Sequence, residues 1–567
     1  MQKNWTLKSY NKKVAKAIAN ELNIPEVLGV LLVQRGIESF DQAKLFFRPS
    51  IDKLHDPFLM KDMRKAVDRL VLALEKKEKI LVFGDYDVDG TCSVAMVYQF
   101  LSQLSDQIEY YIPDRYTEGY GLSDKGVDYA IDQGFSLVIT LDCGIKSVEK
   151  IKRASESNVD FIVCDHHIPS EEIPPAIAVL DPKQSDCNYP YKELCGCGVG
   201  FKLLQALSEV LSLEKENLYS YLDLVSLAIA ADIVPITGEN RILCYYGLNE
   251  INSNIRTGIK ALLPITDKPK SYIISDLVFT LAPRINAAGR IRSGKYAVKL
   301  LVEKDPSLAE IVSKQIEEDN TFRRELDKEI TREALIQIQE NDRTSELKST
   351  VVYSENWHKG VVGIVASRII EQYYKPTVVL TRSGDTATGS ARSVSGFDLY
   401  KALEECEEHL LQFGGHMHAA GMTMEIEKIG AFTEGFENAV KNAITAAQLI
   451  PEIEIDLELE FNELNFKLYR IIQQMAPFGP GNPEPLLSSK NVYDTGYSRC
   501  VGKEGEHLKL HIRQDSSGPI DAIAFNLGSY YEKIKNGAPF NIAYYLQENQ
   551  WNGKTKLQLM VKDIQFS

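Results

Sequence analysis

The sequence predicts an α/β protein in which two α/β domains are joined by a long helix and followed by a small β-barrel. Short runs rich in Val, Ile and Leu alternate with polar segments of helical length from Ile80 to about Asp181, which is typical of a parallel sheet with crossover helices. A second alternation of this kind begins at Thr350. After residue 452, strand-like runs follow one another with Gly and Asn turns, which indicates a barrel of roughly five or six strands.

The local pattern sets the expected order of the domains. Residues 1–75 show helical spacing of Ala, Leu, Val and Ile broken by prolines, so we expect a small helical N-terminal segment. The first α/β domain should cover 76–300, with a mostly helical second half. The stretch at 301–345 is rich in Glu, Lys, Arg and Gln and is expected to form the connecting helix. The second α/β domain should cover 346–446, and the barrel 452–567.

The composition excludes several classes of protein. Hydrophobic residues make up 44% of the 567 residues, and no apolar run approaches the ~18 residues of a membrane span. The first residues lack the apolar block of a signal peptide, which predicts a cytoplasmic protein. Nine irregularly spaced cysteines without a CxxC pair argue against disulfides and zinc. The net charge of −15 does not exclude a nucleic-acid partner, because a basic groove can be confined to one face.

Aspartates and a pair of histidines, spread over four short segments, form the candidate metal site. Three of the segments follow strand-like runs, and the carboxyl ends of parallel strands meet at one edge of a sheet. In the first segment the acids alternate, so in an extended chain they would point the same way, with Gly84 and Gly90 giving freedom to turn. Carboxylates with imidazole hold divalent metals, and paired metals hydrolyse phosphate esters. The residues are Asp85, Asp87, Asp89, Asp142, Asp165, His166, His167 and Asp232.

A calcium-binding loop is the alternative for the first segment, DYDVDG. Such a loop needs an acid at its twelfth position, which here is Met96, a residue that cannot bind calcium. Imidazole in a site made mainly of carboxylates favours Mn²⁺, and Mg²⁺ should be able to substitute. The four segments together predict a site for two divalent metal ions that hydrolyses a phosphodiester.

These motifs resemble those of the DHH phosphoesterase superfamily, which are carried here by FGDYDVDGTCS, ITLDCGI, ADIVP and Asp165-His166-His167. Further motifs resemble the RecJ exonuclease family within it, in order along nearly the whole chain. On this resemblance the first α/β domain is a DHH catalytic domain, the second a DHH-associated domain, and the barrel an OB fold. The further motifs are YIPDRYTEGYG at 111–121, CGCGVGFKL, PRINAAGR at 283–290, HKGVVGIVASR at 358–368, GSARS at 389–393, FGGHMHAAG at 413–421 and PFGPGNPEP at 477–485.

The resemblance implies hydrolysis of single-stranded DNA from the 5′ end to 5′-mononucleotides, in DNA repair and recombination. Asp142 is best placed to bridge two ions, while the ion that each other ligand serves stays open. His167 would contact the scissile phosphate or assist proton transfer, and Asp165 would orient the histidines. Two alternatives remain: a phosphodiesterase for short oligonucleotides or cyclic dinucleotides, and a non-catalytic DNA-binding relative. The implied metal ligands are Asp85, Asp87, Asp89, Asp142, His166 and Asp232.

Two motifs suggest how a DNA end would be held. Arg115 offers a forked guanidinium to phosphate, and Tyr116 or Tyr120 could stack on a base or serve only in packing. Ser390 and Arg392 in GSARS, flanked by small residues, predict a pocket for a terminal 5′-phosphate.

Three further motifs leave alternatives open. In FGGHMHAAG the paired glycines should precede a helix whose N-terminus binds phosphate near His416, unless the glycines only pack. Arg284 and Arg290 either grip the DNA backbone or brace the two domains. Trp357 and His358 fall at a strand-to-helix turn that we expect to face the cleft.

The barrel should hold the strand near the active site. Phe525, Tyr544, Tyr545 and Trp551 either stack on bases or fill the core. Two lobes and a barrel would form a ring that admits only a single strand. The implied partners are single-stranded DNA, single-strand-binding protein and a helicase, with no membrane, and a monomer is expected. Because the chain ends soon after the barrel, we expect it to lack the extra C-terminal domain of some longer relatives.

Overall fold

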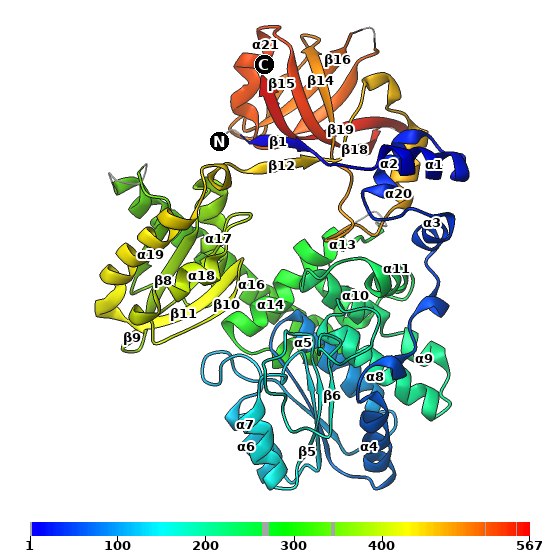
Figure 1. Ribbon diagram of the computed structural model, residues 1–567, viewed down its shortest axis with the longest axis vertical. Coiled ribbons are helices and arrows are strands. Elements are labelled where there is room, and N and C mark those ends of the chain that lie inside the picture. Colours follow the sequence, from blue (N-terminus) through cyan, green and yellow to red (C-terminus); the bar gives the residue numbers. More distant parts are fainter. Residues whose placement is uncertain (1–2, 264–270, 342–345, 516, 552, 567) are drawn as a thin grey trace. The chain divides into compact units, whose positions relative to one another are not determined.

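The structure is a computed structural model that describes residues 3–263, 271–341, 346–515, 517–551 and 553–566. The chain forms two compact units, and each is built from segments that are far apart in sequence (Figure 1). The first unit contains Met1–Asn4, His55–Asp232 and Gly247–Pro451, and the second contains Trp5–Leu54, Ile233–Tyr246 and Glu452–Ser567.

The first unit contains the predicted parallel sheet, with strand order β3-β2-β4-β5-β6. Helices cover both faces, so β2 and β4 are buried along their whole length. Phe83 and Phe161 pack under α6 and α7 on one face, while α4, α5 and α8 lie on the other (Figure 1). The bounds are β2 (Ile80–Gly84), β3 (Ile108–Tyr111), β4 (Leu137–Leu141), β5 (Asp160–Cys164), β6 (Ala178–Leu180), α4 (Met63–Glu75), α5 (Val88–Leu101), α6 (Asp124–Asp132), α7 (Val148–Glu156) and α8 (Gly196–Val210).

The segment that follows the sheet is helical, as the sequence predicts. No helix in the described part of the chain is both long and apolar enough to cross a membrane. The helices are α9 (Lys215–Tyr219), α10 (Leu222–Ala231), α11 (Gly238–Ser253), α12 (Thr257–Leu262), α13 (Ile274–Asp276), α14 (Ala282–Ile291) and α15 (Lys295–Val302).

The predicted connecting helix is α16 (Pro306–Glu340), and residues 342–345 of the predicted range lie outside the described residues. Two buried aspartates on α16 tie it to elements on either side. Asp319 pairs with Arg292 at the end of α14 (2.7 Å), and Asp327 pairs with Arg368 of α17 (2.8 Å). The helix is thus held by ion pairs to both α/β domains.

The second α/β domain has strand order β10-β11-β9-β8-β7, in which only β7 and β8 run parallel. α16 and α17 cover one face of the sheet, where their apolar side chains share a core with Trp357 and with Val379 of β8. α18 and α19 pack on the other face. The bounds are β7 (Thr350–Ser354), β8 (Thr377–Ser383), β9 (Thr386–Arg392), β10 (Gln412–His416), β11 (Ala419–Glu425), α17 (Val362–Gln372), α18 (Leu399–Glu404) and α19 (Ile429–Ala443).

The helix predicted after the glycines of FGGHMHAAG is wrong, because this motif forms the hairpin of β10 and β11. Ala and Met favour helices, but β11 pairs with β9 along its whole length. Pairing with a strand about 30 residues earlier in the chain overrides the local propensity. Gly415 supports the hairpin, since its φ is 150° and a Cβ there would lie 2.3 Å from the carbonyl oxygen of Ala419.

The second unit contains the predicted barrel. Its strands follow the order β13-β14-β18-β19-β17-β16-β15, and a further pairing of β14 with β16 closes the sheet on itself. The fold class expected from sequence is therefore confirmed. The bounds are β13 (Leu457–Glu458), β14 (Leu487–Asp494), β15 (Arg499–Val501), β16 (His507–Gln514), β17 (Ile520–Ala524), β18 (Phe540–Trp551), β19 (Lys554–Phe566), α20 (Phe466–Gln474) and α21 (Tyr531–Lys535).

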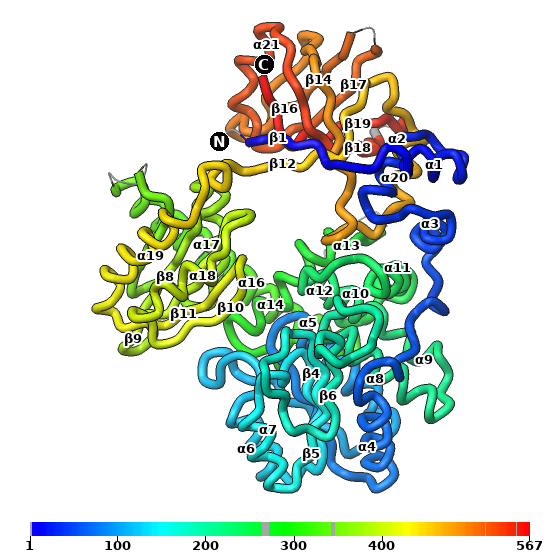
Figure 2. The backbone as a smooth tube through the Cα atoms, in the orientation of Figure 1, coloured from blue at the N-terminus to red at the C-terminus, as the bar shows by residue number. Residues whose placement is uncertain are grey.

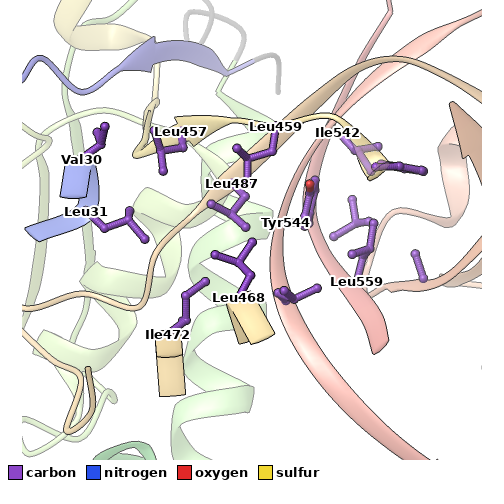
Figure 3. Close-up of a cluster of buried hydrophobic side chains, with 14 of the residues drawn as sticks. Val30, Leu31, Leu457, Leu459, Leu468, Ile472, Leu487, Ile542, Tyr544 and Leu559 are labelled. Atoms are coloured by element: carbon purple, nitrogen blue, oxygen red, sulfur yellow. The ribbon is translucent and has the colours of Figure 1, made fainter. Parts of the chain in front are cut away.

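The N-terminal segment, for which helices were expected, begins with a strand. Its first element is a strand, β1 (Asn4–Leu7), which pairs with β12 (Glu452–Ile455), and the next three helices lie beside the barrel (Figure 2). Val30 and Leu31 share one hydrophobic core with Leu468, Ile472 and Leu559 (Figure 3). Periodicity predicts such helices but cannot show what they pack against. The helices are α1 (Lys12–Leu22), α2 (Glu26–Val33) and α3 (Phe40–Phe47).

Candidate metal centre and phosphate site

The predicted acids meet at the carboxyl edge of the parallel sheet. Asp85 follows β2, Asp142 follows β4 and Asp165 follows β5, and these three strands are adjacent and parallel. The backbone of Asp142 is left-handed, with φ at 59°, which turns the chain at the end of its strand. Asp232 reaches the same site from the C-cap of α10.

The DYDVDG segment is not extended, contrary to the sequence prediction. Asp87 is the N-cap of α5 and accepts a hydrogen bond from the amide of Gly90 (3.1 Å), so Asp89 lies in the first helical turn. Gly84 and Gly90 both have negative φ, so the turn here does not depend on a left-handed glycine conformation. A Cβ on Gly90 would lie 2.4 Å from the carbonyl oxygen of Asp85. Glycine is needed there because the helix begins directly against the strand.

His166 joins carboxylates from three different segments. Its Nε2 lies 3.1 Å from Asp142 Oδ1, 3.6 Å from Asp232 Oδ2 and 3.8 Å from Asp89 Oδ2. His166 is buried, whereas 29% of the Asp232 side chain is exposed. The group therefore lies at a surface that a substrate can reach from the side of Asp232.

Backbone amides at the start of α8 orient Asp89. The amides of Gly196 and Cys197 donate to its two carboxylate oxygens at 2.7 and 2.8 Å. A Cβ on Gly196 would lie 2.6 Å from the Cβ of Asp142, so only glycine lets the helix approach both acids. Sequence reasoning missed this role. The signal was the glycine-rich CGCGVG segment that opens a helix.

Asp165 holds the second histidine. Its Oδ1 accepts hydrogen bonds from the ring Nδ1 of His167 (2.7 Å) and from the amides of His166 (2.7 Å) and His167 (3.2 Å), and its Oδ2 accepts one from the amide of Ile145 (3.0 Å). Burial opposes ionisation of Asp165, but the hydrogen bond and charge of His167 lower its pKa overall. The carboxylate is thus fully used in orienting the histidine segment.

Crowding of negative charge dominates the electrostatics of the site. Burial and then repulsion between neighbouring carboxylates raise the pKa of Asp89 to about 7 and that of Asp232 to about 8. The same causes raise the pKa of Asp85 and Asp142. Burial lowers the pKa of His166 to about 3, so its neutral ring offers a lone pair. A positive charge placed among these carboxylates would relieve their mutual repulsion.

The donor set fits a divalent cation. The ligand atoms of Asp89, His166 and Asp232 lie within 4.8 Å of one another. Asp85 Oδ2 is buried and has no hydrogen-bond partner among the described residues. A cation would supply the missing charge, and carboxylate oxygens with one imidazole nitrogen suit Mn²⁺ or Mg²⁺.

A group of guanidinium side chains lies beside the acids. Arg115 stands over the ring of Tyr86, the residue between the first two acids of DYDVDG, with its Cζ 5.1 Å from the ring centroid. Burial and the charges of Arg115, Arg323 and Arg392 lower the pKa of Arg290 to about 10. Arg115, Arg323 and Arg392 therefore all lie near Arg290, and such a concentration of positive charge favours an anion. Arg323 was not foreseen, because nothing distinguishes it within the charged sequence of α16.

Ser390 and Arg392 form the arrangement predicted for a phosphate pocket. Both lie on β9, and Arg392 Nη1 donates to Ser390 Oγ (2.7 Å). Gly363 lies in the first turn of α17, and a Cβ there would come within 2.8 Å of Arg392 Nη2 and 3.1 Å of Ser390 Oγ. The hydroxyl and the guanidinium therefore stand directly beside the start of a helix, where anions are stabilised.

Comparison with known proteins identifies this combination of domains and sites. Family models match in three places: DHH family, N-terminal domain, at 79–229; DHHA1 domain at 346–442; and RecJ OB domain at 455–563. The single-stranded-DNA-specific exonuclease RecJ of Bacillus subtilis is 36% identical over 99% of this chain and 71% of its own length. The exonuclease of the same name from Salmonella typhimurium is 34% identical over 96% of each chain. The chain belongs to the RecJ family.

Solved RecJ structures agree with this assignment. RecJ of Thermus thermophilus in complex with Mn²⁺ matches with a TM-score of 0.85 and 27% identity, over 100% of this chain and 80% of that one. The complex of the same protein with Mg²⁺ matches with a TM-score of 0.79 and 26% identity, over 100% and 78%. The predicted family is confirmed, and the metal-bound RecJ structures support divalent metal as the cofactor, which the acid and histidine group of this chain could hold.

Several predicted DNA-binding residues serve in packing between elements. The hydroxyl of Tyr116 donates to the carbonyl oxygen of Arg290. The side chain of Arg290 in turn donates from Nη1 to the carbonyl oxygen of Gly360 (3.1 Å). Arg284 pairs with Glu317 of α16 (2.6 Å). These contacts are the ones expected if Arg284 and Arg290 brace the two domains rather than grip the DNA backbone.

The remaining predicted residues of this domain lie in different surroundings. The ring of His358 lies edge-on to that of Tyr116, with centroids 6.0 Å apart. Trp357 is buried and donates to Glu333 (2.8 Å), so its predicted cleft position is wrong: the indole fills the interface with α16. His416 lies on β10, and burial together with the charges of His418 and Arg392 lowers its pKa.

The predicted barrel aromatics also divide. Tyr544 is fully buried, and its hydroxyl bonds to Ser489 Oγ (2.9 Å), so it belongs to the core. Tyr545 is partly buried, and Phe525 is 54% exposed beside His507. The side chain of Trp551 lies outside the described part of the chain. Tyr497, which the sequence did not single out, is 78% exposed on the same barrel.

Proposed function

We propose that this chain is a 5′-to-3′ exonuclease that hydrolyses single-stranded DNA to 5′-mononucleotides in DNA repair and recombination. The observation that carries the proposal is the pairing of two sites within one unit: an acid and histidine group that fits divalent metal, and a guanidinium cluster with a hydroxyl pocket for a phosphate. Together they would hold a phosphate-bearing end and hydrolyse the adjacent phosphodiester.

Two divalent ions would be held, with Mn²⁺ preferred and Mg²⁺ able to substitute. Six ligands from four segments exceed the needs of one ion, and the nitrogen donor supports the preference for Mn²⁺. When bound, the ions would activate water, neutralise the phosphate and stabilise the leaving oxygen. The proposed ligands are Asp85, Asp87, Asp89, Asp142, His166 and Asp232, with Asp142 as the bridge.

The chain supplies the orientation of the reacting groups. His167, with its Nδ1 hydrogen-bonded to Asp165, would contact the scissile phosphate or assist proton transfer. Asp165 is proposed as a positioning residue rather than a metal ligand, because both of its oxygens already accept hydrogen bonds.

The phosphate pocket would decide which end is cut. Ser390 and Arg392 would bind a terminal 5′-phosphate, and Arg115 would neutralise charge between that end and the metal site. An enzyme that recognises the terminus cuts from it, which accounts for exonuclease rather than endonuclease action.

The barrel would hold the strand that follows. Tyr497 and Phe525 are exposed on its surface, and Arg499 and Lys509 are exposed on the neighbouring strands β15 and β16, so stacking and phosphate contacts are both available. We further propose a monomer that works in the cytoplasm with single-strand-binding protein and a helicase. The named relatives are bacterial, and their DNA lies in the cytoplasm.

One assay tests the proposal. Single-stranded DNA labelled at its 5′ end, the same strand in a blunt duplex, and a cyclic dinucleotide are each incubated with Mn²⁺, Mg²⁺ or EDTA. The expected result is release of labelled mononucleotide from the single strand only, with either metal, and its loss in Asp142→Ala. Cleavage of the cyclic dinucleotide alone would establish the phosphodiesterase alternative, and DNA binding without cleavage would establish the non-catalytic one.

A further inference from the structure

The loop between β3 and α6 presents one tyrosine to the catalytic histidine. Tyr120 lies between Gly119 and Gly121, whose φ angles are 86° and 78°, a left-handed conformation that favours glycine. The two bends direct the side chain outward, and 55% of it is exposed. Its hydroxyl oxygen lies 3.2 Å from Nε2 of His167.

The hydrogen bonds of the ring define what this contact does. Asp165 is a carboxylate that accepts from His167 Nδ1 at 2.7 Å, so that nitrogen carries a proton. The hydroxyl of Tyr120 can bond to the other nitrogen in either state of the ring, as donor to a neutral Nε2 or as acceptor from a protonated one. The imidazole is thus held at both nitrogens, by the buried Asp165 at Nδ1 and by the exposed Tyr120 at Nε2.

The position of Tyr120 is itself anchored to the metal site. The amide of the next residue, Gly121, donates to Asp85 Oδ1 at 3.1 Å. The ring of Tyr120 meets that of Tyr86 edge-on, with centroids 6.0 Å apart, and Tyr86 is only 8% exposed. One short segment therefore touches both a proposed metal ligand and His167.

We propose that Tyr120 is a positioning residue that fixes the ring of His167 relative to the metal site. A single anchor at Nδ1 leaves the ring free to pivot about that hydrogen bond, and the second anchor at Nε2 removes this freedom. Correct orientation of the imidazole accelerates the chemical step rather than DNA binding. The inference rests on the proposed function, in which His167 faces the scissile phosphate. The competing interpretation is that the exposed ring stacks on a base.

Two substitutions separate these interpretations. Tyr120→Phe keeps the ring and removes the hydroxyl, and Tyr120→Leu removes both. Loss of one neutral hydrogen bond should lower kcat by roughly 3- to 10-fold in Tyr120→Phe, with KM changed by less than about 2-fold. In Tyr120→Leu, kcat should fall at least as far. A Phe variant with wild-type kcat, and a rise in KM confined to the Leu variant, would overturn the proposal in favour of stacking.

A second measurement uses dependence on His167. Single-turnover reactions with enzyme in excess are followed for hours so that slow cleavage can be measured. In the His167→Ala background, adding Tyr120→Phe should not lower the cleavage rate constant further. Independent, multiplicative losses would contradict a role through His167. The matched control is Tyr129→Phe, which removes a hydroxyl on α6 that bonds to Glu109 and should leave kcat unchanged.

The controls also separate this inference from the proposed function. Equal thermal unfolding midpoints for wild type and Tyr120→Phe are expected, since the side chain is largely exposed, and a matching loss of stability would assign the hydroxyl to folding instead. A wild-type protein without exonuclease activity would contradict the proposed function. An active wild type together with a Tyr120→Phe variant of wild-type kcat would contradict only the role of Tyr120.

Discussion

Replacing Gly196 by alanine should damage the metal site from a position that is not a ligand. The new Cβ would lie 2.6 Å from the Cβ and 2.7 Å from the Cα of Asp142, far inside the ~3.5–4.0 Å of carbon contacts. Because one partner is backbone, the clash can be relieved only by moving the start of α8. That movement stretches the hydrogen bonds of 2.7 and 2.8 Å that the amides of Gly196 and Cys197 donate to Asp89.

The expected size follows from these two effects. Overpacking costs about 1–3 kcal/mol of unfolding free energy, and loss of a partner that orients a metal ligand lowers metal affinity about 10- to 100-fold. Denaturant unfolding and calorimetric titration with Mn²⁺ measure the two quantities. The matched control is Gly198→Ala in the same helix, where the nearest atoms to the Cβ would be in the side chains of Leu194 (3.3 Å) and Cys195 (3.8 Å) and none in the backbone of Asp142. Equal Mn²⁺ affinity in the two variants would refute the reasoning.

Further outcomes are expected at the other sites. Asp142→Ala, or chelation by EDTA, should lower kcat by about 1,000-fold or more, and appreciable activity in EDTA would exclude metal catalysis. Arg392→Lys should slow cleavage of 5′-phosphorylated strands about 10- to 100-fold and of 5′-hydroxyl strands much less, because lysine lacks the forked guanidinium; equal losses would argue against the pocket. Tyr544→Phe should cost about 1 kcal/mol of unfolding free energy without changing DNA affinity, since its hydroxyl is buried on Ser489. Tyr497→Ala should do the reverse and weaken binding of single strands about 10-fold in a fluorescence titration, and unchanged binding would remove this residue from the DNA path.

Patterns that repeat within a few residues were readable from the sequence. Runs of branched apolar residues predicted the parallel sheet, and the acids that follow β2, β4 and β5 predicted a shared rim, because parallel strands end at one edge. The charged stretch predicted α16 within a few residues of its ends. GSARS predicted a phosphate pocket at Ser390 and Arg392, and the structure adds that the two side chains lie on one strand and are hydrogen-bonded to each other.

Contacts between distant segments were not readable. The hairpin of β10 and β11 depends on pairing with β9, and the role of Trp357 depends on Glu333 of α16. The N-terminal helices were foreseen as helices, but their packing with Leu468 and Leu559 of the barrel unit was not. In each case the deciding partner lies too far along the chain for local propensity to report it.

The sequence by itself determined the chemistry of this protein: which segments end in acids, that two histidines accompany them, and that a RecJ-like order of motifs surrounds them. Only the tertiary structure decided how those groups are held. Gly196 allows the start of α8 to approach Asp89 and Asp142 closely. Both carboxylate oxygens of Asp165 accept hydrogen bonds that orient the histidine segment, and Tyr120 contacts His167 from a loop 47 residues earlier in the chain. The physical reason is that donor identity is a property of single residues, whereas orientation depends on hydrogen bonds and close approaches that exist only after folding.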